Sequence, residues 1–183
     1  NWGEDVIALD IDAGIYNWDT SGGISTASNV ASVITNAPTK TKFMIVSNPD
    51  RHLICFGTET TIGTTSTQDP MFIRWSDQDD FNSWTATATN SAGSQRVTGG
   101  SKIVTAVSTR GQILFLTDTS AHGMSFIGAP FTFGFQKLGT NCGAVSPHCA
   151  VDISGMVYWM SSDGFYMFDG TVRKMPCSVE DFV

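Results

Sequence analysis

Short apolar runs separated by small polar residues extend along the whole chain. The runs are four to seven residues long and rich in Val, Ile, Phe, Tyr, Trp and Thr, which favour strands, while Gly, Asn, Asp, Ser or Pro separates them. No long stretch carries the apolar period of an amphipathic helix; the nearest case, residues 29–35, is short and β-branched. The pattern predicts an all-β chain with strands at 6–10, 14–18, 42–47, 52–56, 71–75, 103–108, 112–117, 123–127, 150–153, 157–160 and 165–168.

Four places in the chain share one layout, in which a turn containing Asp, Asn, Arg or Gly leads into an apolar strand. They lie at residues 12–18, 50–56, 110–116 and 154–160. Their starts are roughly 40 to 60 residues apart, which is the period of propeller blades built from four antiparallel strands. A single blade cannot bury both of its faces, so neighbouring blades must stack.

This repeat predicts a β-propeller or a part of one, made of short antiparallel blades. At about 45 residues per blade, 183 residues give about four blades, and the first looks incomplete. We therefore expect residues 1–183 to be a single all-β region of a larger propeller whose remainder lies outside this chain. A β-sandwich is the alternative architecture.

Composition narrows the functional classes. Hydrophobic residues make up 41% of the chain, so a packed core is expected, whereas charged residues reach only 15%. The 17 acidic and 10 basic side chains give a net charge of −7, which argues against a dedicated nucleic-acid binder with a basic face. No apolar run approaches the length of a membrane-spanning helix.

The four cysteines give little indication of a metal or disulfide site. Cys55 lies in an apolar run and is expected to be buried. Cys142 and Cys149 bracket a turn-rich stretch, where they could form a disulfide or, with His148, a zinc site that lacks an obvious fourth ligand. Free thiols fit assembly in a reducing cytoplasm, and we expect no cofactor and no metal.

Motifs for catalysis are missing from the sequence. It contains no G-x-S-x-G, Walker A, G-x-G-x-x-G or H-E-x-x-H pattern, and we expect no catalytic residue. The acidic segment with Asp77, Asp79, Asp80 and then Trp84 is typical of an Asx-rich turn whose carboxylates cap backbone N–H groups. A calcium loop or a glycosidase carboxylate pair are the alternatives for this segment.

Two further features are candidates for contacts. Phe131, Phe133 and Phe135 alternate along a strand and share one face, which is either core or an exposed stripe that contacts another subunit. The loops at residues 58–69 and 85–100 are nearly uncharged, and we expect them to be connectors between blades or contact loops in an assembly.

The segment Ile73-Arg74-Trp75-Ser76-Asp77, followed by an acidic turn and Trp84, resembles the repeat of tailed-phage tail-hub and nozzle propellers. This family includes the packaged-DNA stabilisation proteins of short-tailed phages. The similarity extends over about residues 69–183, with further matching segments at 90–94, 126–134, 141–143, 158–161 and 165–170. The family has no agreed catalytic residues, so the resemblance transfers none.

The resemblance implies a structural virion protein, not an enzyme. It would form part of a homo-oligomeric ring in the tail, contacting copies of itself and neighbouring tail and portal proteins, after assembly in the bacterial host cytoplasm. The ring would retain packaged DNA and conduct it during ejection without specific binding, and no membrane contact is expected. An acidic or neutral lining suits this role, because basic groups would bind phosphates and slow DNA passage.

Two other classes of function remain open from the residues. One is a carbohydrate- or receptor-binding tail module that uses Trp84 and the neighbouring Asp residues. The other is a propeller glycoside hydrolase that uses two among Asp77, Asp79, Asp80 and Asp163.

Overall fold

The computed structural model describes residues 2–21, 23, 30–48 and 50–177. Within these residues the chain forms antiparallel β-sheets and one short 3-10 helix, so the predicted all-β class is confirmed. No helix in this part of the chain is long and apolar enough to cross a membrane. The chain divides into two compact units, Asn1–Val97 and Thr98–Val183, which are described separately below.

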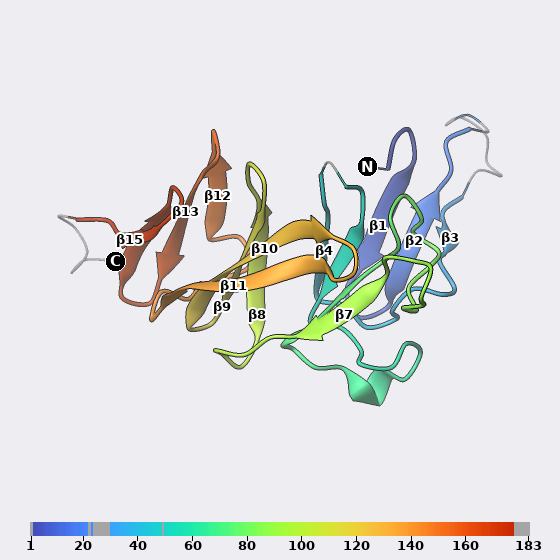
Figure 1. Ribbon diagram of the computed structural model, residues 1–183, viewed down its shortest axis with the longest axis horizontal. Helices are drawn as coiled ribbons and strands as arrows, with labels where there is room; N and C mark the ends of the chain where they lie inside the picture. The colour runs from blue at the N-terminus through green and yellow to red at the C-terminus, as the bar shows by residue number, and fades with distance from the viewer. Residues whose placement is uncertain (1, 22, 24–29, 49, 178–183) are drawn as a thin grey trace. The chain divides into compact units, whose positions relative to one another are not determined.

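The first unit holds a three-stranded and a four-stranded sheet, in which each strand pairs with the next strand along the chain (Figure 1). The 3-10 helix, Thr65–Thr67, lies in the loop between β5 and β6. The strands in sheet order are β1 (Val6–Asp10), β2 (Gly14–Trp18) and β3 (Ser32–Val33), then β4 (Phe43–Val46), β5 (Leu53–Phe56), β6 (Phe72–Trp75) and β7 (Gly93–Arg96).

The second unit holds two four-stranded sheets with the same succession of neighbouring strands. In this unit the first strands of the two sheets, β8 and β12, lie beside each other. The strands are β8 (Ile103–Ser108), β9 (Ile113–Thr117), β10 (Ser120–Gly128) and β11 (Thr132–Thr140), then β12 (Ala150–Ile153), β13 (Met156–Ser161), β14 (Gly164–Phe168) and β15 (Val172–Lys174).

The turns of the predicted repeat occupy the same place in all four sheets. Each connects the first strand of a sheet to the second, and each contains a residue in the left-handed backbone region. These residues are Asp12 (φ 59°), Arg51 (φ 48°), Gly111 (φ 89°), and Ser154 with Gly155 (φ 58° and 90°). Asp and Gly tolerate this conformation well, which explains why turn residues recur there in the sequence.

Each unit has its own hydrophobic core between its two sheets. In the first unit, Ile7 and Ile15 of one sheet pack in a cluster with Leu53 and Cys55 of the other. Burial raises the pKa of the Cys55 thiol to about 12, so Cys55 is an inert core residue, as the sequence predicts.

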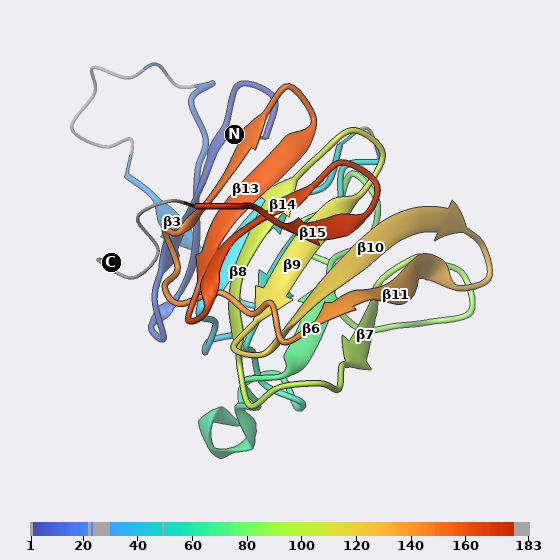
Figure 2. The same cartoon turned by 90° about the vertical axis from the view of Figure 1, so that its left-hand side faces the viewer.

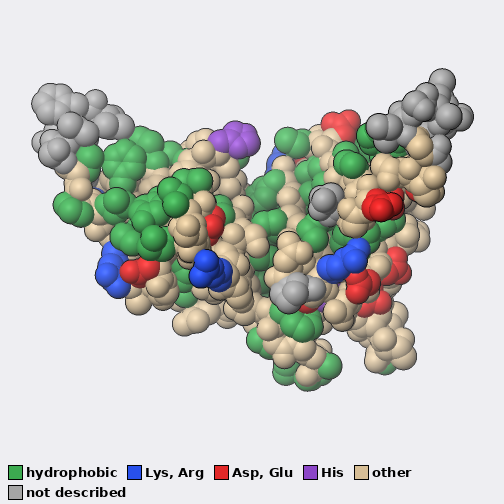
Figure 3. All heavy atoms as spheres, turned by 90° about the horizontal axis from the view of Figure 1, so that it is seen from above, with side chains coloured by type: hydrophobic (Ala, Val, Ile, Leu, Met, Phe, Trp, Pro, Cys, Tyr) green, Lys and Arg blue, Asp and Glu red, His purple; other side chains and the backbone are tan. Residues whose placement is uncertain are grey.

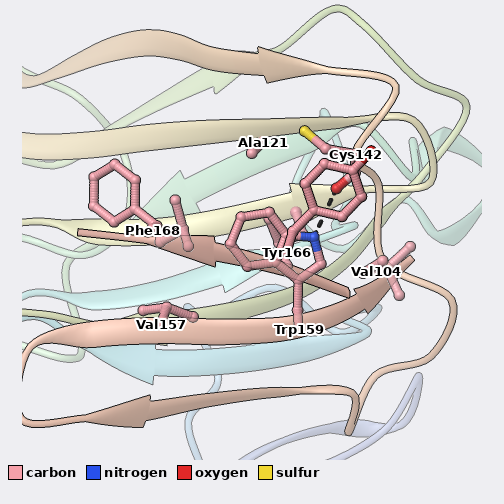
Figure 4. Close-up of a cluster of buried hydrophobic side chains, with 10 residues drawn as sticks. Val104, Ala121, Cys142, Val157, Trp159, Tyr166 and Phe168 are labelled. Carbon is pink, nitrogen blue, oxygen red and sulfur yellow. Dashed lines mark hydrogen bonds between the residues drawn. The ribbon is translucent and has the colours of Figure 1, made fainter. Parts of the chain in front are cut away.

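In the second unit, the core is built around Trp159 and Tyr166, whose rings stack with centroids 5.8 Å apart (Figure 4). Val104 and Ala121 from the other sheet of this unit complete the same cluster. The Trp159 Nε1–H donates a 2.7 Å hydrogen bond to the carbonyl of Cys142, so the one polar group of the indole is satisfied inside the core.

Some elements differ from the sequence prediction. The segment 85–100 is not a loop throughout, because β7 forms within it and pairs with β6. The sequence Gly-Ser-Gln-Arg of β7 has no apolar pattern, and Gly93 is needed because a Cβ there would lie 2.5 Å from the ring of Trp75.

The four cysteines, Cys55, Cys142, Cys149 and Cys177, are all free thiols in the structure.

Candidate functional site

Arg74, the cation of the Arg74-Trp75-Ser76-Asp77 motif, is buried in the first unit and is only 8% exposed. Its Nη2 donates to the backbone carbonyls of Glu59 (3.3 Å) and Thr60 (2.8 Å), and its Nη1 to the carbonyl of Trp84 (3.5 Å). The first two carbonyls belong to the β5–β6 loop and the third to the β6–β7 loop. A single guanidinium therefore holds both loops in place.

Glu59 supplies the buried negative charge beside this cation. Its side chain is fully buried, and its carboxylate accepts hydrogen bonds from the backbone N–H and hydroxyl of Thr39 and from the N–H of Gly63 (2.8 Å). Burial lowers the pKa of Arg74, while the negative charge of Glu59 favours its protonated form. The two opposite charges and their hydrogen bonds thus fix the start of the β5–β6 loop.

The other residues of the motif anchor the far end of the β6–β7 loop. The Trp75 Nε1–H donates to the carbonyl of Ser91 at 2.9 Å. The Ser76 hydroxyl accepts a hydrogen bond from the N–H of Leu53 and donates one to the carbonyl of Asp77. Asp77 Oδ1 in turn accepts from both the N–H (2.8 Å) and the hydroxyl (2.6 Å) of Ser91. All four motif residues therefore organise loops.

The acidic turn does not gather its carboxylates at one point. Asp79 forms an ion pair with Arg51 at 3.0 Å, and Asp80 accepts a 2.8 Å hydrogen bond from the N–H of Asn82. Asp77 accepts the hydrogen bonds from Ser91 that are described above. Within the described residues, no group of three or more His, Cys, Asp or Glu side chains is arranged to hold a metal ion. The turn has the contacts of an Asx-rich turn.

A buried chain of hydrogen bonds reaches this turn from β5. His52 is fully buried; its Nδ1 lies 2.9 Å from Asp50 Oδ2 and its Nε2 lies 3.0 Å from the Ser91 hydroxyl. The same Asp50 oxygen accepts a 2.6 Å hydrogen bond from Ser47. This gives Asp50, His52 and Ser91 the connectivity of a Ser-His-Asp triad, which sequence reasoning did not find because His52 and Ser91 lie 39 residues apart.

The hydrogen bonds of Asp50, His52 and Ser91 hold the β6–β7 loop in position. The one hydroxyl proton of Ser91 is directed to Asp77 Oδ1, and the Ser91 hydroxyl oxygen accepts a 3.0 Å hydrogen bond from the Gln78 N–H. Burial opposes ionisation of Asp77, but the hydrogen bonds from Ser91 and Gln78 outweigh it and lower the pKa of Asp77. The ionised carboxylate therefore joins the two ends of the β6–β7 loop.

Trp84 lies at the wall of an open pocket of about 400 Å³ in the first unit. Its side chain is only 1% exposed, and its Nε1–H donates to the carbonyl of Phe81 at 2.7 Å. The pocket is bordered by the β5–β6 loop, the β6–β7 loop and the segment after β3, with Asn36, Ile62 and Asn82 among its lining residues. Trp84 consequently shapes the pocket and does not present an open ring face.

The predicted phenylalanine stripe is divided by the structure. Phe133 is 4% exposed, and its ring packs edge-to-face on Phe126 with centroids 5.8 Å apart. Phe135 is half-buried, and its ring packs edge-to-face on Phe115. Phe131 precedes β11 and is 73% exposed. Two of the three rings thus pack on their own sheet, and only Phe131 projects into solvent.

The tip of the β10–β11 hairpin contains Phe131 of the predicted stripe and two further contact candidates, Phe126 and Ile127, that the sequence analysis missed. Phe126 (45% exposed), Ile127 (57%) and Phe131 (73%) lie within six consecutive residues that contain no charge. The hairpin extends beyond β8 and β9 of its own sheet (Figures 1 and 2). The signal in the sequence was the apolar run on both sides of a Gly-Ala-Pro turn. We call residues 126–131 the apolar tip.

On the face seen in Figure 3, acidic and basic side chains are few and scattered among hydrophobic and uncharged ones. In the second unit, Asp163, the remaining carboxylate of the hydrolase interpretation, accepts a 3.0 Å hydrogen bond from the hydroxyl of Tyr166 and lies 3.9 Å from the ammonium of Lys174.

Comparison with known proteins adds no relative. No family model matches the sequence, and no curated protein matches it. The likeness to phage tail propellers therefore depends on the residues of this chain themselves.

Proposed function

We propose that this chain is a structural part of the tail hub or nozzle of a tailed phage, where it contributes to a ring that retains packaged DNA and conducts it during ejection. The observation that carries this proposal is the regular succession of four antiparallel sheets, each with the same left-handed turn between its first two strands. This succession is the one expected of propeller blades.

The packing inside each unit supports the propeller part of the proposal. In the second unit the two first strands, β8 and β12, lie side by side, and the two sheets bury a common core. Propeller blades meet in this manner, with their first strands around the axis and their faces stacked. We infer that each sheet is one blade and that chain outside residues 1–183 completes the propeller.

The apolar tip supports assembly into a ring. Three large apolar side chains exposed at the end of one hairpin are costly in water, at roughly 25 cal/mol for each Å² that a partner could cover. Phe131 belongs to the predicted contact stripe, and we assign the contact with a neighbouring copy to Phe131 together with Phe126 and Ile127.

The charge of the chain supports passage of DNA without binding. With 17 acidic and 10 basic side chains, the net charge is −7, which disfavours neutralisation of successive phosphates, and on the face seen in Figure 3 the charged side chains lie among uncharged ones. A ring lined by such a surface would let DNA slide.

The test is sedimentation of the full-length protein with the double substitution Ile127→Ser and Phe131→Ser. We expect the variant to remain folded and to lose self-association that the wild type shows. Val151→Ser, which removes an equally exposed apolar side chain from β12 of the same unit, is the control and should assemble normally. Assembly that survives the double substitution would refute the assigned contact, and a wild type that stays monomeric would refute the ring.

A further inference from the structure

The open pocket beside Trp84 has walls that carry no charge. Its volume of about 400 Å³ falls in the range of small-molecule sites, about 300–1,000 Å³. The exposed amides of Asn36 and Asn82 and the exposed hydroxyl of Thr85 line it, together with the half-buried Ile62. The pocket therefore offers hydrogen-bonding groups of both kinds beside a small apolar area.

Hydrogen bonds hold the two loops that border this pocket, the β5–β6 loop and the β6–β7 loop. Arg74 ties the carbonyls of Thr60 and Trp84, one from each bordering loop. On the β6–β7 loop, the Asn90 side chain accepts a hydrogen bond from the Thr87 N–H (2.9 Å) and donates one to the carbonyl of Thr85 (2.9 Å). Because these contacts order the loops before a ligand binds, binding would not include the free-energy cost of ordering them.

The chemistry of the walls selects the class of ligand. A side-chain amide presents both donors and an acceptor, and a hydroxyl does the same, so they match groups that also donate and accept. A phosphate or carboxylate would lose its hydration here and gain no cationic partner among the lining residues. A ligand rich in neutral hydroxyl groups fits both conditions.

We propose that this pocket binds a neutral saccharide unit through hydrogen bonds from Asn36, Asn82 and Thr85, with Ile62 as the apolar contact. Trp84 acts as a buried wall and not as a stacking platform, since its side chain is 1% exposed. The proposal is independent of the tail function, because it concerns a pocket within the first unit alone.

The experiment uses an array of neutral and acidic bacterial surface oligosaccharides, followed by titration calorimetry with the best neutral glycan. We expect binding of neutral glycans by the wild type, and an increase of about tenfold in Kd on Asn82→Ala and on the near-isosteric Thr85→Val. Gln136→Ala, which removes an exposed amide from β11 in the other unit, should leave Kd unchanged.

Three results would overturn the proposal. They are the absence of any neutral glycan bound on the array, a preference for acidic glycans, and wild-type affinity in both pocket variants. Asn82 and Thr85 are exposed, so their substitution leaves the core intact, and Thr85→Val keeps the side-chain volume if Asn82→Ala should fold poorly.

Discussion

Arg74 shows how one side chain can organise a large part of a small unit. It is nearly fully buried, and it donates hydrogen bonds to carbonyls of two loops that have few apolar residues of their own. The guanidinium adds to the core packing of Trp84 and to the contacts of Ser91 with His52 and Trp75, which also hold the loops to the sheet.

We therefore expect Arg74→Met to lower the free energy of unfolding by about 3 kcal/mol, because buried carbonyls and the Glu59 charge lose their partner. Chemical denaturation measures this change. Arg96→Met is the matched control: Arg96 pairs with Asp69 at 2.6 Å, but its side chain is 57% exposed, so the loss should be about 1 kcal/mol or less. Equal effects of the two substitutions would contradict this account of Arg74.

His122 makes stability depend on pH. Its ring is 6% exposed, stacks on Phe115 and lies opposite Lys137 across the β10–β11 pair. Burial first, and then the positive charge of Lys137, lower the pKa of His122 below its ordinary value of 6.5. The unfolded chain therefore binds a proton at higher pH than the folded chain, and stability decreases as the pH falls below about 6.5.

The measurement is the free energy of unfolding at about pH 7.5 and about pH 5.5. We expect the wild type to lose stability between these values and His122→Gln to lose less, since glutamine does not titrate in this range. The same decrease in both proteins would show that other groups carry the pH dependence.

Among the elements, the strands with a clear apolar pattern were predictable, whether they lie inside a sheet or at its edge, and β3 and β7, which lack such a pattern, were not. β1, β2, β8 and β12 have the predicted bounds because their alternating or β-branched patterns are clear. β3 has two residues, and β7 has no apolar side chain, so no periodicity marks either; pairing with a neighbouring strand creates them.

The site was less predictable than the fold. The motif at Arg74–Asp77 was visible, but its contacts were not, because Ser91 comes to His52 and Asp77 only when β7 pairs with β6. Phe126 and Ile127 of the apolar tip were missed for a similar reason. An apolar residue on a strand is core or surface according to the sheet that covers it, which the sequence does not specify.

Two phenylalanines of the β10–β11 hairpin test the difference between a core and a surface apolar residue. Phe133→Ala should lower the free energy of unfolding by about 3 kcal/mol, because a buried ring leaves a cavity. Phe131→Ala should change it by less than about 0.5 kcal/mol, because that ring is already in solvent. Thermal and chemical denaturation measure both effects. A large loss of stability for Phe131→Ala would mean that the tip packs within its own chain.

At the scale of the whole molecule, the features are those that the proposed assembly component needs. Four sheets with a common turn provide stackable blades, buried charges fix the loops of the first unit, and an uncovered apolar tip in the second unit provides a contact surface. The acidic net charge is compatible with a channel for DNA, because it disfavours binding of the channel wall to the phosphates. The tail-ring proposal accounts for these features together.

The most direct test of the tail-ring proposal is electron microscopy of the full-length protein over a range of concentrations. The proposal predicts closed rings with rotational symmetry and a central channel wide enough for duplex DNA, with each subunit containing stacked four-stranded blades. Monomers at every concentration, or an open aggregate without rotational symmetry, would contradict it.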